Sequence, residues 1–469
     1  MTDRPHLAVI GAGPAGLAAT LAAAGHGTRV TLIDSAAEAG GQFYRQPATE
    51  LHARRPQALH HQWQTWERLR DGLHNHVKAG SVQHLTEHHI WFVERLPRGF
   101  AVHALLGPEQ QDPATVHADA VLLATGGYEQ VLPFPGWTLP GVLTAGGAQA
   151  MLKGTLTVPG RRAVVAGTGP LLLPVATGLA AAGVEIVALV ESADPRTLLR
   201  QSRTLAAHPG KLGEGVLYTG QLLRRRTRTL YHHTVVEAHG TDRVEAVTVA
   251  ALDAEGRVRP GTERRIPCDT LAVSHGMLAH TDLAESLGCR LDGTHVHVDE
   301  EQRTDVPGVW AAGEATGIGG SGLALAEGHI AGNSAAARLA DTEPDPGEWA
   351  AAAKSRTKLR QFATALDRVY RPPAHWTEQV TDDTVVCRCE EVTAGAVREA
   401  VGALGAGDLR TVKLLTRAGM GWCQGRVCGP AVAGLAGCAL TASRRPFARS
   451  VALVVLARAG EESAQSYVK

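Results

Sequence analysis

The fold of this chain is decided by the stretch His6-Leu-Ala-Val-Ile-Gly-Ala-Gly-Pro-Ala-Gly-Leu-Ala-Ala-Thr20. A short apolar run rich in β-branched residues leads into a glycine turn, and an Ala- and Leu-rich helical pattern follows. This strand–turn–helix context is the one in which Gly-x-Gly-x-x-Gly binds a dinucleotide. Gly11 allows the tight turn, Gly13 leaves space for a pyrophosphate, and Gly16 lets the helix lie close to the strand. The N-terminal end of the helix then faces the phosphates.

A second strand, Arg29–Ile33, ends at an acidic residue, Asp34. Its spacing of roughly twenty residues from the glycine turn is typical of the acid that accepts hydrogen bonds from the ribose hydroxyls. Gly40-Gly41-Gln42 comes next, and two glycines there allow the backbone to approach the far end of a dinucleotide. Each motif alone could be an ordinary turn. Because strand, glycines, helix, strand and acid agree, we predict dinucleotide binding.

Composition restricts the class of protein. The chain has 469 residues, enough for two or three domains, and its formal net charge of zero disfavours a nucleic-acid partner. No apolar run reaches the ~18 residues of a membrane span, and the first strand begins too close to Met1 for a signal peptide. We therefore expect a cytoplasmic protein, in which disulfides are rare. Four of the seven cysteines lie between Cys387 and Cys428, which suggests metal binding.

Two later strands end in glycine motifs. Ala118–Ala124 runs into Thr125-Gly126-Gly127, and the strand that begins near Gly308 ends in Gly313-Glu314. In flavoproteins, segments of this kind bring the chain back against the flavin nucleotide. Their position on either side of an intervening strand–turn–helix unit makes the pair more informative than either motif alone.

The intervening unit begins at Arg162 and contains Gly167-x-Gly169. Leu172 stands where a third glycine belongs, and it should push helix and strand apart or reshape the phosphate loop. The second strand of this unit ends at Glu191, an acid that would favour NAD over NADP. Two alternatives stay open, a nicotinamide site and a domain that keeps the fold without that ligand.

The cysteine-rich part follows a predicted amphipathic helix, Trp349–Tyr370, which Pro372 and Pro373 end. Four thiolates in two short-range pairs, Cys387-x-Cys389 and Cys423-x4-Cys428, suit either a [2Fe–2S] cluster or tetrahedral zinc. Spacing does not decide between them, but a one-electron relay is useful beside a flavin. The other cysteines are interpreted as ordinary, and His275 as a loop histidine without a special role.

Taken together, these motifs resemble the larger FAD-containing subunit of bacterial amino-acid dehydrogenase complexes: opine oxidase, hydrogen cyanide synthase, and dye-linked proline or hydroxyproline dehydrogenase. The stretches that carry the resemblance are Val9–Gly16, Gly40–Tyr44, Ala124–Gly127, Leu132–Val142, Thr144–Gln149, Gly167–Leu173, Val306–Gly320 and Cys387–Gly429. The resemblance implies an α/β fold with two Rossmann-like dinucleotide-binding domains, as in glutathione reductase. A small, mainly helical iron–sulfur module similar to bacterioferritin-associated ferredoxin would follow them.

The expected domain boundaries follow from this resemblance. They are a discontinuous FAD-binding domain, 1–127 and 268–345; an inserted second dinucleotide-binding-like domain, 128–267; a helix and linker, 346–380; a four-cysteine module, 381–445; and a C-terminal tail, 446–469. The ferredoxin-like module usually ends in Cys-x-x-Cys, whereas here four residues separate the last two cysteines, as in the opine-oxidase group.

The resemblance also implies the site residues and cofactors. FAD would bind at Gly11, Gly13, Pro14, Ala15, Gly16, Asp34, Gly41, Gln42, Thr125, Gly126, Gly313 and Glu314. A second nucleotide (NAD, ATP or FMN) is an open alternative at Gly167, Gly169 and Glu191. The metal ligands would be Cys387, Cys389, Cys423 and Cys428, around a [2Fe–2S] cluster. No residue is assigned as a catalytic acid or base.

The function implied is that of an electron-transferring subunit, which passes electrons from the oxidation of an amino or imino acid to a quinone or other acceptor. A smaller flavoprotein partner would oxidise the proline-, hydroxyproline-, opine- or glycine-type substrate. The complex could lie on the inner face of the membrane. Two rivals remain: a self-contained NAD(P)H-dependent flavin oxidoreductase, and a non-catalytic, zinc-stapled nucleotide-binding protein. Disulfide reductase chemistry is excluded because no redox Cys-x-x-Cys is present.

Overall fold

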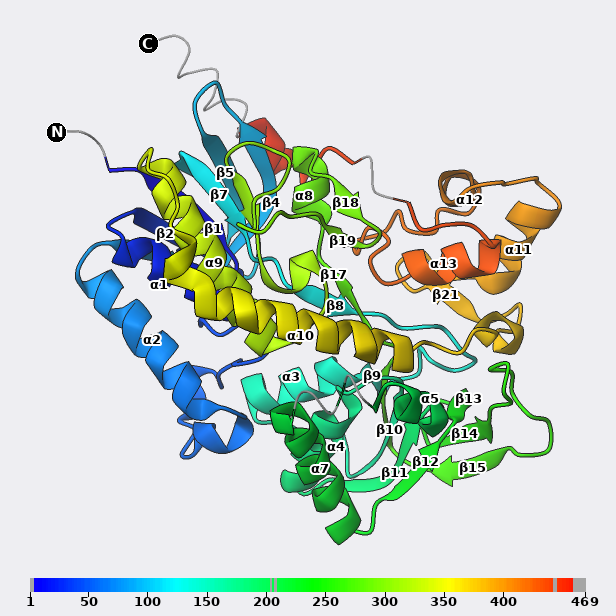
Figure 1. The fold of residues 1–469 in the computed structure, drawn as a ribbon. Helices are drawn as coiled ribbons and strands as arrows, with labels where there is room; N and C mark the ends of the chain where they lie inside the picture. The colour runs from blue at the N-terminus through cyan, green and yellow to red at the C-terminus, as the bar shows by residue number, and fades with distance from the viewer. Residues whose placement is uncertain (1–3, 203–204, 206–208, 442–444, 459–469) are drawn as a thin grey trace.

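Two parallel five-stranded sheets form the body of the computed structural model, which describes residues 4–202, 205, 209–441 and 445–458 (Figure 1). In order across the first sheet, the strands are β20 (Val309–Ala311), β7 (Ala120–Leu123), β1 (His6–Ile10), β2 (Arg29–Ile33) and β3 (Val82–Leu85). In the second sheet they are β12 (Arg228–Tyr231), β11 (Glu185–Glu191), β10 (Arg162–Gly167), β16 (Thr270–Ser274) and β9 (Val142–Thr144). This architecture confirms the predicted fold class.

Each parallel sheet is accompanied by an antiparallel three-stranded sheet. Beside the first are β4 (His88–Arg95), β5 (Phe100–Leu106) and β6 (Asp112–Ala118), and beside the second β13 (His233–His239), β14 (Ala246–Ala251) and β15 (Arg264–Pro267). A ribbon of β8 (Gly127–Glu129) and β17 (Met277–Ala279) connects the two halves, and β18 (Leu291–Asp292) pairs with β19 (His295–Val296). Each half therefore consists of a parallel five-stranded sheet and an antiparallel three-stranded sheet.

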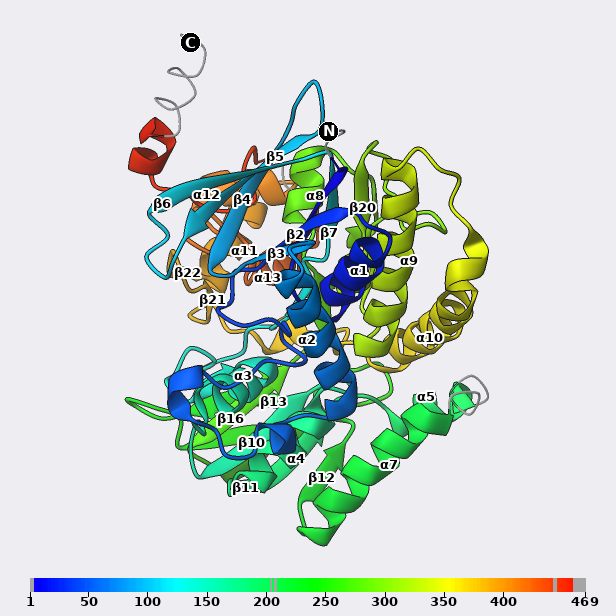
Figure 2. The same cartoon turned by 90° about the vertical axis from the view of Figure 1, so that its left-hand side faces the viewer.

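Helices cover both sheets. The first half carries α1 (Pro14–Gly25), α2 (Trp63–Lys78), α8 (Asp282–Leu287) and α9 (Ser321–Leu339); the second carries α3 (Ala145–Thr155), α4 (Leu172–Ala181), α5 (Pro195–Arg200) and α7 (Pro209–Arg224). Short 3₁₀ helices lie at Thr49–Leu51, Pro56–Leu59, Gly313–Thr316, Pro346–Trp349 and Trp376–Gln379. The amphipathic helix predicted before the double proline is α10 (Ala350–Val369), which crosses from α9 towards α5 (Figures 1 and 2).

The first glycine helix is fixed by close packing of small residues. A Cβ added to Gly328 of α9 would lie 2.1 Å from the carbonyl oxygen of Ala15, and one added to Gly332 would lie 2.3 Å from that of Ala19. The backbones of α1 and α9 therefore approach too closely for any side chain between them. This packing sets the position of α1 along its axis.

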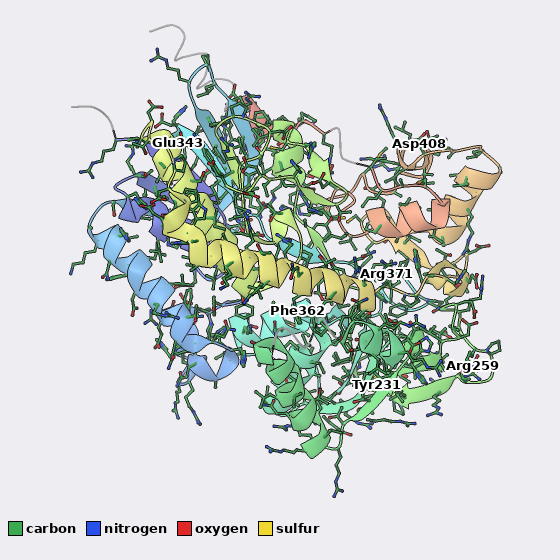
Figure 3. The ribbon with its side chains drawn as sticks, viewed as in Figure 1. Tyr231, Arg259, Glu343, Phe362, Arg371 and Asp408 are labelled. Atoms are coloured by element: carbon green, nitrogen blue, oxygen red, sulfur yellow. The ribbon has the colours of Figure 1, made fainter. Side chains whose placement is uncertain are left out.

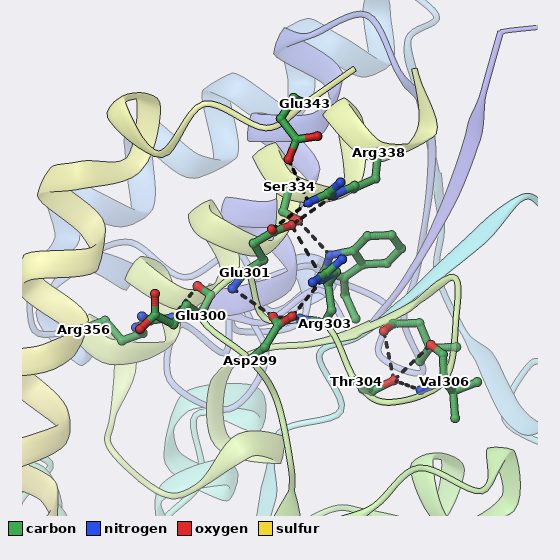
Figure 4. A network of polar contacts seen from close by, with 12 residues as sticks. Asp299, Glu300, Glu301, Arg303, Thr304, Val306, Ser334, Arg338, Glu343 and Arg356 are labelled. Atoms are coloured by element: carbon green, nitrogen blue, oxygen red, sulfur yellow. Dashed lines mark hydrogen bonds and ion pairs between the residues drawn. The ribbon is translucent and has the colours of Figure 1, made fainter. Parts of the chain in front are cut away.

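A polar network fixes the loop that leads into β20 (Figure 4). The Glu301 carboxylate accepts hydrogen bonds from Ser334 Oγ (2.8 Å) and Arg338 Nη2 (2.9 Å) on α9. Ser334 in turn accepts a bond from the indole nitrogen of Trp310 in β20 (3.1 Å). Strand β20 and helix α9 are thereby held in register, which places the segment between them at the carboxyl edge of the sheet.

The second domain extends beyond the boundary expected at residue 267. Strand β16 pairs in parallel with both β10 and β9, so it lies within the second sheet. The chain leaves the second sheet after β16 and returns to the first half at β17. We accordingly place this boundary after Ser274. The sequence did not predict it, because an apolar strand does not reveal in its own sequence which sheet it joins.

Leu172 reshapes the second glycine turn, as expected. Helix α1 begins at Pro14, directly after Gly13, whereas α4 begins at Leu172, three residues after Gly169. The Leu172 side chain is 1% exposed, so it has become part of the core between α4 and its sheet. At the equivalent Gly16 a Cβ would lie 1.7 Å from the carbonyl oxygen of Gly11. A later helix start is how the second loop avoids that overlap.

The C-terminal module is a small helical unit beside both halves (Figure 1). It contains β21 (Val385–Cys387), β22 (Val392–Thr393), α11 (Ala394–Gly402), α12 (Leu409–Thr416) and α13 (Gly429–Ala436) around its own apolar core. Thr393 caps α11, its hydroxyl accepting from the amide of Ala396. Asp408, labelled in Figure 3, caps α12 in the same way. The expected C-terminal tail is described only to residue 458; 459–469 lie outside the described residues.

His275 has a structural role that its sequence context did not reveal. It is buried just after β16, and its Nδ1 accepts a hydrogen bond from the amide of Leu132 (3.1 Å). Burial lowers the pKa of His275 to about 4. The imidazole is therefore neutral at pH 7 and anchors the segment that begins at Leu132.

We expect His275 to make the protein sensitive to acid. A histidine whose pKa is about 6.5 in the unfolded chain and about 4 when folded stabilises the fold above pH 6.5, and this stability is lost as the pH falls towards 4. The loss is of the order of 3 kcal/mol. In urea unfolding, His275→Gln should be less stable than the wild type at pH 7.5, and the difference should shrink or reverse at pH 4.5. The exposed His52→Gln is the control, and a pH-independent difference for His275→Gln would contradict the assignment.

Candidate flavin and iron–sulfur sites

The predicted flavin residues converge at the carboxyl edge of the first sheet. Gly11 follows β1 with a φ of +106°, and the amide of Gly40 donates to the Ala12 carbonyl (2.8 Å). A Cβ on Gly41 would lie 2.8 Å from the Cα of Gly13. The first glycine turn and Gly40-Gly41 are thus in backbone contact, and neither bears a side chain that would keep a ligand away.

Asp34 lies at the end of β2 and faces the same turn. Its carboxylate accepts hydrogen bonds from the amides of Ala12 (2.5 Å) and Ala36 (2.7 Å). These two bonds fix the side chain beside the glycine turn. The acid is only partly buried, so its oxygens remain within reach of a ligand hydroxyl.

The two returning segments meet each other and the glycine helix. A Cβ on Gly313 would lie 2.8 Å from the Cβ of Ala15, and one on Gly127 would lie 3.6 Å from a carboxylate oxygen of Glu314. The Thr125 hydroxyl donates to the carbonyl of His280 (2.6 Å), so it has a structural partner. Gln42 differs from the others, because its side chain is exposed and accepts bonds from Arg45.

Two helix N-termini open onto this edge without a side-chain cap. The N-cap positions are Gly13 for α1 and Gly320 for α9, and neither first turn carries an acidic residue. Uncapped amides at the positive end of a helix attract phosphate and other electron-rich groups. The bare glycine backbones, the fixed acid and the two helix N-termini fit the phosphate and ribose groups of a dinucleotide such as FAD. The amide of Gly320, at the N-cap of α9, donates to the Glu314 carboxylate (3.3 Å).

Sequence reasoning missed a buried ion pair behind this site. Glu327 of α9, 1% exposed, pairs with Arg360 of α10 and accepts bonds from the amide of Gly313 (3.0 Å) and the hydroxyl of Thr316 (2.8 Å). Arg360 also donates to the Gly317 carbonyl (2.9 Å). The pair therefore fixes the loop that follows β20. The charged residue inside an apolar helix pattern was the signal available in the sequence.

Lys153 was also missed. This buried residue of α3 donates from Nζ to the carbonyl of Phe43 (2.9 Å), which joins the second domain to the loop after Gly41-Gln42. Burial, with the neighbouring charge of Arg45, lowers the pKa of Lys153 to about 8. Lys153 thus ties the two dinucleotide-type domains together at this edge.

The second glycine turn also has an acid beside it, Glu191, but this acid is more deeply buried than Asp34. Glu191 accepts hydrogen bonds from the amides of Gly169 (3.1 Å) and Ala193 (2.9 Å), the same pattern as at Asp34. It is 7% exposed, and burial raises its pKa to about 7. Among the residues that the structure describes, two buried hydroxyls at this carboxyl edge lack a hydrogen-bond partner: Ser192 and Ser274.

The four cysteines predicted as ligands lie together in the module. Cys389 neighbours Cys423, Cys423 neighbours Cys428, and Cys428 neighbours Cys387, so the thiols form a chain of adjacent pairs. A hydrogen bond from Cys428 lowers the pKa of Cys423 to about 4, and the same bond raises the pKa of Cys428. The Cys423 and Cys428 thiols therefore lie within hydrogen-bonding distance of each other.

Four adjacent thiols match the ligand demand of an iron–sulfur cluster. In the described part of the chain, no group of three or more His, Cys, Asp or Glu side chains is arranged around one metal position. A [2Fe–2S] cluster needs two thiolates on each of two irons, and a chain of adjacent thiols suits that demand. Cys438 lies beyond the end of α13 and is not one of the four neighbouring thiols.

Two protein families match this chain. Residues 5–340 match the pyridine nucleotide-disulphide oxidoreductase family, and residues 385–436 match the BFD-like [2Fe-2S] binding domain. These families indicate FAD and a [2Fe–2S] cluster as the cofactors.

Curated relatives extend over nearly the whole chain. The A-type polypeptide of opine oxidase from Agrobacterium tumefaciens is 32% identical over 92% of this chain and 85% of its own length. The HcnB polypeptide of hydrogen cyanide synthase from Pseudomonas aeruginosa is 32% identical over 90% of each chain. The alpha polypeptide of sarcosine oxidase from a Corynebacterium species is a more distant relative, 30% identical over 70% of this chain and 32% of its own. All three are named as subunits of their enzymes.

Solved structures agree with the fold. L-proline dehydrogenase from P. horikoshii superposes with a TM-score of 0.66 at 20% identity, covering 97% of this chain and 81% of that one. T. acidophilum thioredoxin reductase covers 71% of this chain and 97% of its own, with a TM-score of 0.52 and 20% identity. In the described residues, no helix combines the length and apolarity that a membrane crossing needs.

The paired glycine–acid sites, the four-thiol module and the family matches lead to one conclusion. The chain belongs to the pyridine nucleotide-disulphide oxidoreductase family, and within it to the FAD- and [2Fe–2S]-containing group that includes the A-type polypeptide of opine oxidase and HcnB of hydrogen cyanide synthase.

Proposed function

We propose that this chain is the electron-transferring subunit of a heteromeric dehydrogenase that acts on CH–NH or CH–NH₂ donors. A smaller flavoprotein partner would oxidise the amino or imino acid, and this chain would pass the electrons to a quinone or other acceptor. The observation that carries the proposal is the presence, in one chain, of a flavin-type site and a four-cysteine module bonded to the half that forms this site. Relatives that are themselves named as subunits support a partner.

The chain's own residues would hold the cofactors. Asp34 would accept from the ribose hydroxyls, and the amides of α1 and α9 would face the pyrophosphate and flavin. The thiolates of Cys387, Cys389, Cys423 and Cys428 would ligate iron. FAD supplies the uptake of an electron pair and its release one electron at a time, and the cluster supplies the one-electron relay. Oxidation of the donor to an imine releases two electrons and two protons, and the acceptor takes up both electrons.

The test uses the co-purified complex. The chain should be expressed with a small flavoprotein partner of the opine oxidase or hydrogen cyanide synthase type, and dye reduction measured with proline, 4-hydroxyproline, an opine and glycine. We expect activity with one donor class, and none when each polypeptide is assayed separately. A stable complex that contains flavin and iron yet reduces dye with none of these donors would contradict the proposal.

An NAD(P)H-dependent flavin oxidoreductase is the second candidate, favoured by the acid–amide contacts of Glu191 and the unpartnered hydroxyls beside it. The later start of α4, at Leu172, disfavours a standard nicotinamide site. NAD, ATP and FMN remain the alternatives for a second nucleotide. Anaerobic addition of NADH separates the two functions. Fast bleaching of the flavin supports the oxidoreductase, whereas slow or absent bleaching supports the electron-transferring role.

A further inference from the structure

The module is fixed to the body next to each of its cysteine pairs. One contact involves Trp137, in the Pro-Phe-Pro-Gly-Trp segment that no site so far accounts for. Its buried indole nitrogen donates to the carbonyl of Val385 (2.6 Å), and the guanidinium of Arg388 lies 5.5 Å from its ring centroid. Arg388 stands between Cys387 and Cys389, so this contact fixes the first pair.

The second contact is a largely buried carboxylate with two arginine partners. Asp282, at the start of α8, is bound by Arg426 Nε at Oδ2 (3.0 Å) and by Arg445 Nη2 at Oδ1 (2.8 Å). The Asp282 side chain is 10% exposed, and the two arginines are 19% and 21% exposed. Arg426 lies between Cys423 and Cys428, so Asp282 holds the loop that carries the second pair.

Further bonds on the module side make this contact a network. Arg445 donates to the side-chain oxygen of Gln424 (3.2 Å), and Arg426 donates to the Ala448 carbonyl. The amide of Ala448 donates to the Trp91 carbonyl in β4 (2.9 Å). The segment after the module thus returns to the flavin-binding half and closes around the same loop.

Asp282 is also close to the flavin-side residues. His280, two residues earlier, accepts the Thr125 hydroxyl at its carbonyl and donates from its amide to the Gly126 carbonyl (3.0 Å). Its Nε2 lies 3.4 Å from Asp282 Oδ2. A short path of direct contacts therefore runs from Thr125-Gly126 through His280 and Asp282 to Arg426 in the cysteine loop.

We propose that Asp282 is a positioning residue for electron transfer within the chain: it fixes the Cys423–Cys428 loop against the flavin-binding half. The inference rests on the proposed function. Loss of the carboxylate leaves two largely buried arginines without their common partner, a change that is far more costly than loss of an exposed ion pair. The loop would then detach from the body without losing its thiols.

The test compares Asp282→Asn with a matched control, Asp292→Asn, whose ion pairs with Arg290 and His297 are exposed. Samples with full flavin and iron are reduced by a light flash, and the approach of the flavin and cluster bands to equilibrium is followed. For Asp282→Asn we expect at least ~10-fold slower equilibration and at least ~10-fold faster amide exchange in 423–428. The spectrum of the dithionite-reduced cluster should stay unchanged, and Asp282→Glu should restore most of the rate.

Unchanged equilibration and exchange in Asp282→Asn, at full cofactor content, would overturn the positioning role and leave the proposed function intact. Wild-type protein without iron would overturn the proposed function instead. If Asp282→Asn does not fold, Arg426→Lys serves in its place, because it keeps the charge but loses the two-sided contact with Asp282 and Ala448. The same slower equilibration and faster exchange are expected, and their absence overturns the inference.

Discussion

Gly16→Leu is expected to yield protein without FAD. A Cβ at this position lies 1.7 Å from the Gly11 carbonyl oxygen and 2.9 Å from its carbon, so helix and turn cannot both keep their places. The second domain avoids this overlap at Leu172 by starting its helix later. Helix α1 cannot start later in the same way, because its residues Ala15 and Ala19 pack directly against Gly328 and Gly332 of α9.

The expected loss of affinity for FAD is about 5- to 150-fold, since overpacking that moves backbone typically costs 1–3 kcal/mol. Gly25→Ala is the matched control: it lies at the end of the same helix, and a Cβ there meets no atom within 4 Å. Flavin per chain is measured after gel filtration. If Gly16→Leu keeps its full flavin content, the glycine turn is not where the dinucleotide binds.

Cys423→Ala is expected to abolish the iron–sulfur cluster while leaving FAD in place. Cys423 stands in the middle of the thiol chain, next to both Cys389 and Cys428. Its removal leaves one iron with a single protein ligand. Iron and acid-labile sulfide should fall from about two per chain to background.

Cys438→Ala is the control for this substitution, because Cys438 lies outside the thiol chain. It should keep all of its iron. Retention of iron in Cys423→Ala, or its loss in Cys438→Ala, would show that the ligand set is different from the one described.

The sequence predicted those parts of the fold that local patterns determine. Residues close together in the chain define each of these features: the β1–α1 turn, the acids after β2 and β11, and the two cysteine pairs. Leu172 was predicted to disturb its turn, and the structure shows how it does so. Local chemistry of this kind requires no knowledge of distant partners.

Contacts between distant residues were beyond prediction. Asp282 and Arg426 are 144 positions apart, and each alone resembles an ordinary surface charge. Strand β16 has the apolar composition of either sheet, which is why its sequence does not locate the domain boundary. His275 resembles a loop residue in sequence, because burial of a histidine depends on the elements that pack around it. These features emerge only when the halves are assembled.

One measurement tests the central claim, that a single chain carries both FAD and a [2Fe–2S] cluster. The anaerobically purified protein is examined by absorption before and after dithionite, with flavin, iron, zinc and sulfide assayed on the same sample. The account predicts flavin bands with a broad red-shifted shoulder, about one flavin, and about two irons and two sulfides per chain. Flavin accompanied by zinc, or protein without flavin, would contradict it.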